Sequence, residues 1–218
     1  MRVIFYDFIT ESDAPEFLKT PALADNGTVN GLVVNFGTVR TFNAIGIGNT
    51  DAPTLLVDGQ VVTLSQPDSN GLYLLTTPIT ASSVTLTVSL PYTVGRIAIG
   101  MARQFGISPA REPSFWSTAN SRVTLSGQVI PGAGGVSGRK VSVDVRYKFD
   151  SDILTDIYRA FPLQLSRNFP VFFELGECSA SEIYPWTLGY GYFSGKWVFQ
   201  SSVNSFLYSK KLELTEAY

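Results

Sequence analysis

The 218-residue sequence contains no histidine, a single cysteine and few charged residues, which make up 16% of the chain. Without histidine, Ser-His-Asp and Cys-His mechanisms and histidine-ligated metal sites are excluded. The lone Cys178 excludes an internal disulfide and a cysteine-cluster zinc site, and we expect it to be a free thiol in a loop. The formal net charge of −2 gives no overall basic footprint, so no specific nucleic-acid partner is expected.

Long hydrophobic runs are missing as well. The apolar run at residues 3–6 stops at Asp7 and is too short for the core of a signal peptide. No stretch approaches the roughly 18 apolar residues of a membrane helix, so no membrane insertion is expected. Hydrophobic residues nevertheless make up 44% of the sequence, which is enough for a sizeable core, and 13% of all residues are aromatic. Together with many Val, Thr and Ser residues, this composition favours β structure.

The first half of the sequence predicts closely spaced β-strands. Asp58-Gly59 between two apolar runs is a strong hairpin signal, because a type I′ turn needs positive φ at both central residues. In residues 84–90 apolar and hydroxyl side chains alternate, which indicates one buried and one solvated face. Strands at this spacing, without helices, predict a β-sandwich or jelly roll over residues 1–105. The predicted strands are 32–36, 42–47, 54–57, 60–64, 72–75, 84–90 and 96–100.

The second half has a different pattern. Residues 106–120, with two prolines and mixed charges, predict a linker. Residues 123–149 predict a long hairpin, in which strand 123–130 faces a second strand across a Gly-rich tip. Residues 151–161 carry an apolar stripe at helical spacing and predict the one helix, which Pro162 ends. With further strands at 169–175, 197–200 and 206–214, residues 121–218 are predicted to form an α+β domain, and the chain as a whole is mainly β.

Carboxylates are the remaining candidates for acid–base chemistry. Glu174, Glu177 and Glu182 lie close together in the sequence beside several aromatic residues, and a glycosidase needs two carboxylates with aromatic platforms for sugar rings. Nothing in their spacing makes two of these carboxylates face each other. We therefore interpret them as solvated charges around a contact surface and expect no enzymatic activity.

Metal and cofactor sites are not indicated. Asp51, Asp58 and Asp68 lie in predicted turns, where Ca²⁺ could find oxygen ligands, but aspartate is a preferred turn residue in any case. Residues 132–138 are rich in glycine like a phosphate-binding loop, yet they lack the Gly-Lys-Ser/Thr ending and precede a strand rather than a helix. We expect no metal and no cofactor.

Two segments are candidate partner contacts. The Gly-rich tip, with Arg139 at its base, is predicted to be an arm by which a subunit reaches its neighbour. The other segment is an aromatic loop; Tyr and Trp are enriched at interfaces, but a loop packed over the domain's own core would bury the same rings, and both alternatives stay open. The candidate residues are Gly132, Gly134, Gly135 and Arg139 in the tip, and Tyr184, Trp186, Tyr190, Tyr192 and Phe193 in the loop.

Residues 30–37 and 42–49 are similar to the core strands of discoidin-like, galactose-binding-type jelly rolls. In that family a DLG-like turn precedes a strand of the f-n-x-I-x-I kind; here Asn35 takes the acidic position, and the strand reads Phe42-Asn43-Ala44-Ile45-Gly46-Ile47. The resemblance covers about residues 1–100 and implies a jelly roll. The sugar-binding positions of the family lie in variable loops, so it implies no site residue here.

From about residue 120 to 218, the order of elements resembles that of the tail-tube and distal-tail structural proteins of tailed bacteriophages. The matching elements are the hairpin at 123–149, the helix at 150–161 and the closing strands at 197–214. The resemblance implies a subunit of the virion tail or tail tip that forms a homo-oligomeric ring, hexameric or trimeric, and contacts other phage tail proteins. The jelly roll would be an outward decoration. The alternative is a carbohydrate-binding module that attaches to a glycan on the host cell surface.

Overall fold

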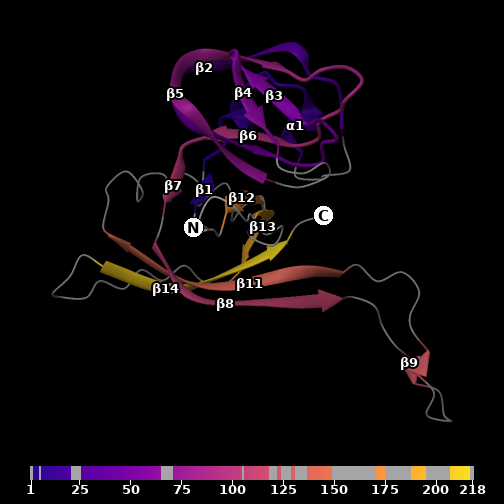
Figure 1. Cartoon of the computed structure of the whole chain (residues 1–218), viewed down its shortest axis with the longest axis vertical. Coiled ribbons are helices and arrows are strands. Elements are labelled where there is room, and N and C mark those ends of the chain that lie inside the picture. Colours follow the sequence, from indigo (N-terminus) through magenta and orange to yellow (C-terminus); the bar gives the residue numbers. More distant parts are fainter. Residues whose placement is uncertain are drawn as a thin grey trace.

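The computed structural model describes residues 2–4, 6–20, 26–64, 71–104, 106–117, 122–123, 129–130, 137–148, 170–174, 188–194 and 207–216 (Figure 1). These residues form three antiparallel sheets of seven, five and two strands, so the prediction of a mainly β chain is confirmed. Within the described ranges, no helix is long and apolar enough to span a membrane. The predicted helix at 151–161 lies outside these ranges.

The five-stranded sheet forms the upper part of the molecule in Figure 1 and has the order β4-β3-β5-β2-β6. Two long strands, β2 (Asn30–Ile47) and β5 (Gly71–Thr87), pair along most of their length, and β3 (Thr54–Val57), β4 (Gln60–Thr63) and β6 (Ile97–Gly100) are short. The pairing of β2 with β5 shifts register between Asn35 and Arg40. Because such irregularities bend strands, the sheet curls around its own core in a β-sandwich-like manner.

Turn chemistry explains which predicted strands stay separate. Asp58 and Gly59 have φ of 46° and 82°, so the predicted hairpin between β3 and β4 is confirmed. By contrast, the predicted strands 32–36 and 42–47 are one continuous strand, β2. The predicted strands 72–75 and 84–90 both fall in β5, which ends at Thr87, three residues before the predicted end. Gly37 between the first pair has a φ of 72°, but it lies in the irregular part of β2 and does not reverse the chain.

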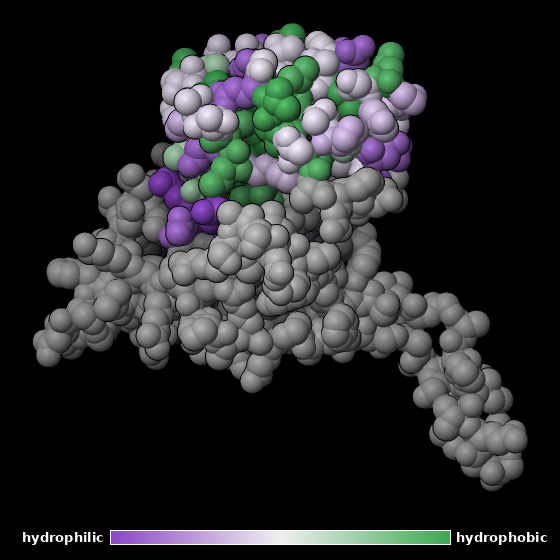
Figure 2. Space-filling view, viewed as in Figure 1, coloured by the Kyte–Doolittle hydropathy of each residue, from purple (hydrophilic) through white to green (hydrophobic). Residues whose placement is uncertain are grey.

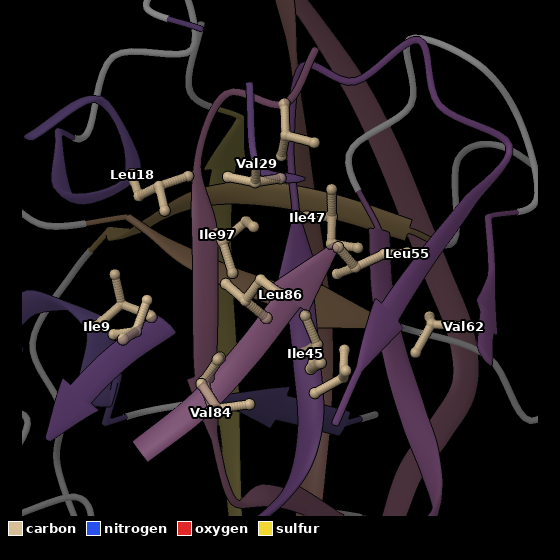
Figure 3. Packing of buried hydrophobic residues seen from close by; sticks show 14 of the residues in the cluster. Ile9, Leu18, Val29, Ile45, Ile47, Leu55, Val62, Val84, Leu86 and Ile97 are labelled. Atoms are coloured by element: carbon tan, nitrogen blue, oxygen red, sulfur yellow. The ribbon is translucent and has the colours of Figure 1, made fainter. Parts of the chain in front are cut away.

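The core of this sheet is built from alternating inward side chains. Leu55 and Val57 of β3 are buried, whereas Leu56 between them is exposed. Figure 3 shows Ile45, Leu86 and Ile97 pointing toward one another from β2, β5 and β6. The core also includes Ile9 from the short 3₁₀ helix η1 (Phe8–Glu11) and Leu18 from α1 (Glu16–Lys19), two elements that the sequence does not predict.

The seven-stranded sheet lies below and has the order β7-β1-β12-β13-β14-β11-β8. Its strands are β1 (Arg2–Ile4), β7 (Ala102–Gln104), β8 (Gly106–Ser117), β11 (Ser137–Lys148), β12 (Val171–Glu174), β13 (Leu188–Ser194) and β14 (Leu207–Glu216). The predicted strands near 169–175 and 206–214 are therefore confirmed, whereas 197–200 lies outside the described residues. The predicted aromatic loop contains the strand β13.

Two predictions for the second half are wrong. Residues 106–117 are not a linker but strand β8, which pairs with β11. Pro109 and Pro113 are compatible with this strand because β8 is an edge of the sheet, where a missing N–H is tolerated. The strand predicted to face 123–130 is also misassigned, because β11 pairs with β8 and β14 instead.

The two large sheets share a buried cluster. Ala44, Leu72 and Ala98 of the five-stranded sheet pack with Phe172 of β12 and Tyr190 of β13. At Gly46 the sheets approach so closely that a Cβ atom would overlap the Phe172 ring. Since β1 also pairs with β12, the predicted division at residue 105 does not separate two self-contained cores.

The third sheet is a small hairpin of β9 (Arg122–Val123) and β10 (Val129–Ile130), in which Val129 lies opposite Val123. Among the described strands, β9 and β10 pair only with each other. Figure 1 shows β9 standing well away from both large sheets, beyond the ends of β8 and β11.

Candidate functional site

The predicted partner contacts are only partly within the described residues. Gly132, Gly134 and Gly135 of the tip, and Tyr184 and Trp186 of the loop, lie outside them. Arg139 lies in β11, opposite Phe115 of β8. Phe193 lies in β13, opposite Leu214 of β14.

Tyr190 does not lie on the surface, as a contact residue would. Its side chain is 0% exposed and packs against Phe172, with ring centroids 4.5 Å apart. For Tyr190, therefore, the correct alternative is burial in the protein's own core. Tyr192, two residues further along β13, is partly buried against the same cluster, because alternate residues of a strand share a face.

A buried ion pair lies beside Tyr190. The Arg96 guanidinium, just before β6, pairs with the Asp7 carboxylate, and their side chains are 1% and 13% exposed. The Asp7 carboxylate also accepts hydrogen bonds from the backbone N–H groups of Ile9 and Ile99, both at 2.9 Å. Arg96 donates a further hydrogen bond to the carbonyl oxygen of Leu18. This pair thus links the N-terminal segment to β6.

Burial is the largest influence on the pKa values of Asp7 and Tyr190. It raises the pKa of the Asp7 carboxyl, although the Arg96 charge and the two backbone N–H groups oppose the shift. Burial also raises the pKa of the Tyr190 phenol, against the charge and hydrogen bond of Arg96. Since Arg96 and Tyr190 are closed to solvent, we assign this cluster a structural role: it joins residues 7–18, β6 and β13.

Sequence reasoning missed this cluster. In the sequence, Asp7 marks only the end of an apolar run and Arg96 only the start of a predicted strand. The available signal was an arginine placed directly before a strand, Ile97–Gly100, whose residues are all apolar. A charge next to a strand of this kind needs a partner once the strand is buried.

The predicted acid–base and calcium candidates have ordinary structural partners where they are described. Glu174 pairs with Arg2 of the neighbouring strand at 3.0 Å, while Glu177 and Glu182 lie outside the described residues. Asp58 accepts a hydrogen bond from the backbone of Thr85 at 2.7 Å, and Asp51 one from that of Thr93 at 2.7 Å. These contacts fit turn aspartates. Asp68 is outside the described residues.

One side of the five-stranded sheet, here called the outer face, carries exposed aliphatic side chains. Leu56 of β3 lies opposite both Val61 of β4 and Thr87 of β5. Val33 of β2 lies opposite Thr85 of β5. Val33, Leu56 and Val61 are 53%, 37% and 62% exposed. The outer face therefore combines aliphatic and hydroxyl groups; no described aromatic side chain is exposed there to form a platform for a sugar ring.

The chain was compared with protein-family models, with curated proteins and with solved structures, and none of the three comparisons finds a match.

Proposed function

We propose that this chain is a structural subunit of a bacteriophage virion, in the tail or tail tip, which acts through homo-oligomeric assembly into a ring and through contacts with neighbouring tail proteins. The resemblance in element order motivates the virion assignment. The observation that carries assembly is the isolated β9–β10 hairpin beyond the ends of β8 and β11 (Figure 1).

An isolated hairpin of this size needs a partner surface. β9 and β10 have two residues each, and a two-stranded hairpin alone in water is at best marginally stable. Three of its four strand residues are apolar: Val123, Val129 and Ile130. A second copy of the chain is a partner that is always present with it, so self-association supplies the missing surface.

The long strands that lead to the hairpin suit a projecting arm. β8 and β11 have 12 residues each and pair in antiparallel fashion up to Ser117 and Ser137. At roughly 3.3 Å per residue, such strands span roughly 40 Å. β14 pairs with β11 only from Lys140 to Lys148, so the end of the β8–β11 pair at Ser117 and Ser137 extends beyond β14, on the side where Figure 1 shows β9.

The test removes residues 118–136, here called the arm, without disturbing the seven-stranded sheet. Ser117 lies opposite Ser137, so residues 118–136 can be replaced by Asn-Gly, which forms a two-residue type I′ turn between paired strands. We expect wild type to form discrete oligomers in sedimentation velocity and rings in negative-stain images. The shortened variant should remain monomeric, with an unchanged circular dichroism spectrum.

A matched control shortens the connection between β4 and β5, residues 65–70, to a flexible Gly-Ser link and should assemble like wild type. The proposed function is refuted if the wild-type protein stays monomeric in solution at every concentration and also forms no oligomer on phage tails. Normal assembly of the arm-deleted variant would refute the role of the arm.

A further inference from the structure

The outer face has an acidic border. Asp58, in the turn between Leu56 and Val61, is exposed, and its carboxylate accepts a hydrogen bond from the backbone of Thr85, the residue opposite Val33. The basic residues of the described parts of 26–100 are Arg40 and Arg96; Arg96 is buried, and Arg40 pairs with Glu11 at 3.5 Å. An apolar surface with a negative border is suited to a partner that is apolar and positively charged.

The arm has the complementary chemistry. Residues 118–136 carry Arg122 and no acidic residue, and Arg139 and Lys140 follow in β11. In the hairpin, Ile130 lies opposite Arg122, so a positive charge and apolar groups occur in the same small sheet. Charge and hydropathy thus match between two parts of one chain.

These two parts cannot meet within one molecule. Figure 1 shows the five-stranded sheet at the top and β9 at the opposite, lower end, with the seven-stranded sheet between them. Figure 2 shows hydrophobic residues gathered among polar ones on the surface of the upper part in the same view. A contact between the two parts must therefore join different copies, and when it repeats head to tail it yields a closed ring or an open filament.

We propose that the β9–β10 hairpin of one copy docks on the outer face of the next copy, with Arg122 near the Asp58 border and the apolar hairpin residues on Val33, Leu56 and Val61. This contact rests on the proposed function, because it specifies how the subunits assemble. It makes the interface heterologous: each subunit gives one arm and receives one.

Charges placed on each of the two surfaces test the pairing in the full-length protein. Val61→Lys places a positive charge on the outer face, and Arg122→Glu places a negative charge on the arm. Each variant alone should raise the dissociation constant for self-association at least about tenfold, because the interface loses its charge complementarity. In the double variant the Val61→Lys charge attracts the Arg122→Glu carboxylate and offsets its repulsion by Asp58, so part of the lost affinity should return. Sedimentation velocity over a concentration series measures all four proteins.

Val39→Lys is the matched control, since Val39 is 67% exposed, close to the 62% of Val61, but lies between Asn35 and Arg40, where β2 shifts register, and not opposite any of the residues that define the outer face. This variant should assemble like wild type. Oligomers of unchanged affinity in both single variants would overturn the docking proposal and leave the proposed function standing. A monomeric wild type would refute the proposed function itself.

Photo-crosslinking is a second test, which detects the contact between subunits without weakening their assembly. A benzophenone amino acid at position 61 should form covalent dimers whose crosslinked peptide contains Arg122, and the same group at position 39 should not. Crosslinks from position 61 to a different segment, or oligomers without any crosslink at this position, would overturn the proposal. Assembly of the photo-labelled protein is checked first, so that failure to fold is recognised.

Discussion

Removing the positive charge of the buried ion pair should destabilise the protein in a pH-dependent way. Arg96→Met keeps a long side chain but leaves the Asp7 carboxylate, 13% exposed, without its cation. Breaking a buried pair by deleting one partner costs about 3–5 kcal/mol. We therefore expect the free energy of unfolding at neutral pH to fall by about that amount.

The pH dependence follows from the carboxyl left behind. Arg96 is the strongest influence that lowers the pKa of Asp7, so its removal raises this pKa further above the ordinary value of 3.8. A folded-state pKa above the unfolded one means that the folded protein takes up a proton more readily. The penalty relative to wild type is thus largest above the folded pKa of Asp7 in the variant and shrinks as the pH falls toward the folded pKa of Asp7 in wild type, by at most about 1.4 kcal/mol per pH unit.

Urea unfolding, followed by circular dichroism at a fixed low protein concentration between pH 4.5 and pH 8, measures this difference. The other carboxyl groups titrate similarly in both proteins and cancel when the variant is compared with wild type. Arg2→Met serves as control, because the Arg2–Glu174 pair is more exposed, at 33% and 18%, and should contribute about 1 kcal/mol or less. A penalty for Arg96→Met that is constant with pH, or that grows on acidification, would refute the reasoning.

Two further predictions concern the junction of the large sheets. Gly46→Ala places a methyl group into the Phe172 ring, and overpacking of this kind should lower the free energy of unfolding by about 1–3 kcal/mol in urea titrations; a neutral effect would mean that the sheets separate easily. A fragment of residues 1–105 exposes the face of Ala44 and Leu72 that Phe172 and Tyr190 cover, and it lacks the β12 partner of β1. We therefore expect it to lack a sharp cooperative melt in calorimetry, and a melt equal to that of the full chain would contradict the shared core.

The strands of the first half were predictable because their signals are local. Asp58-Gly59 needs only its own backbone to form the turn between β3 and β4. The alternation of buried and exposed residues around Leu56 is likewise visible in a short window. A short window of sequence cannot show that Gly37, which has a positive φ, lies in an irregular strand and does not reverse the direction of the chain.

The arrangement of the second half depends on distant partners. Residues 106–117 contain Pro109 and Pro113, and only the position of β8 at the edge of a sheet makes these prolines acceptable in a strand. The location of Tyr190 also depends on a distant residue. Its aromatic neighbours in the sequence suit an interface as well as a core, and the packing of Phe172 against its ring shows that it lies in the core. The Asp7–Arg96 pair joins residues 89 positions apart, a separation at which spacing carries no signal.

The position of β1 has a consequence for how the chain folds during synthesis. Arg2 and its partner Glu174 are 172 positions apart, and β1 lies inside the sheet, between β7 and β12. At a translation rate of about 5–20 residues per second, the first strand leaves the ribosome roughly 10–30 s before its second neighbour. Val3 and Ile4 are fully or almost fully buried in the folded protein. During this interval, one edge of their strand has no partner. Completion of the seven-stranded sheet is therefore a late event, and until β12 is made β7 is the one neighbour among the described strands with which β1 can pair.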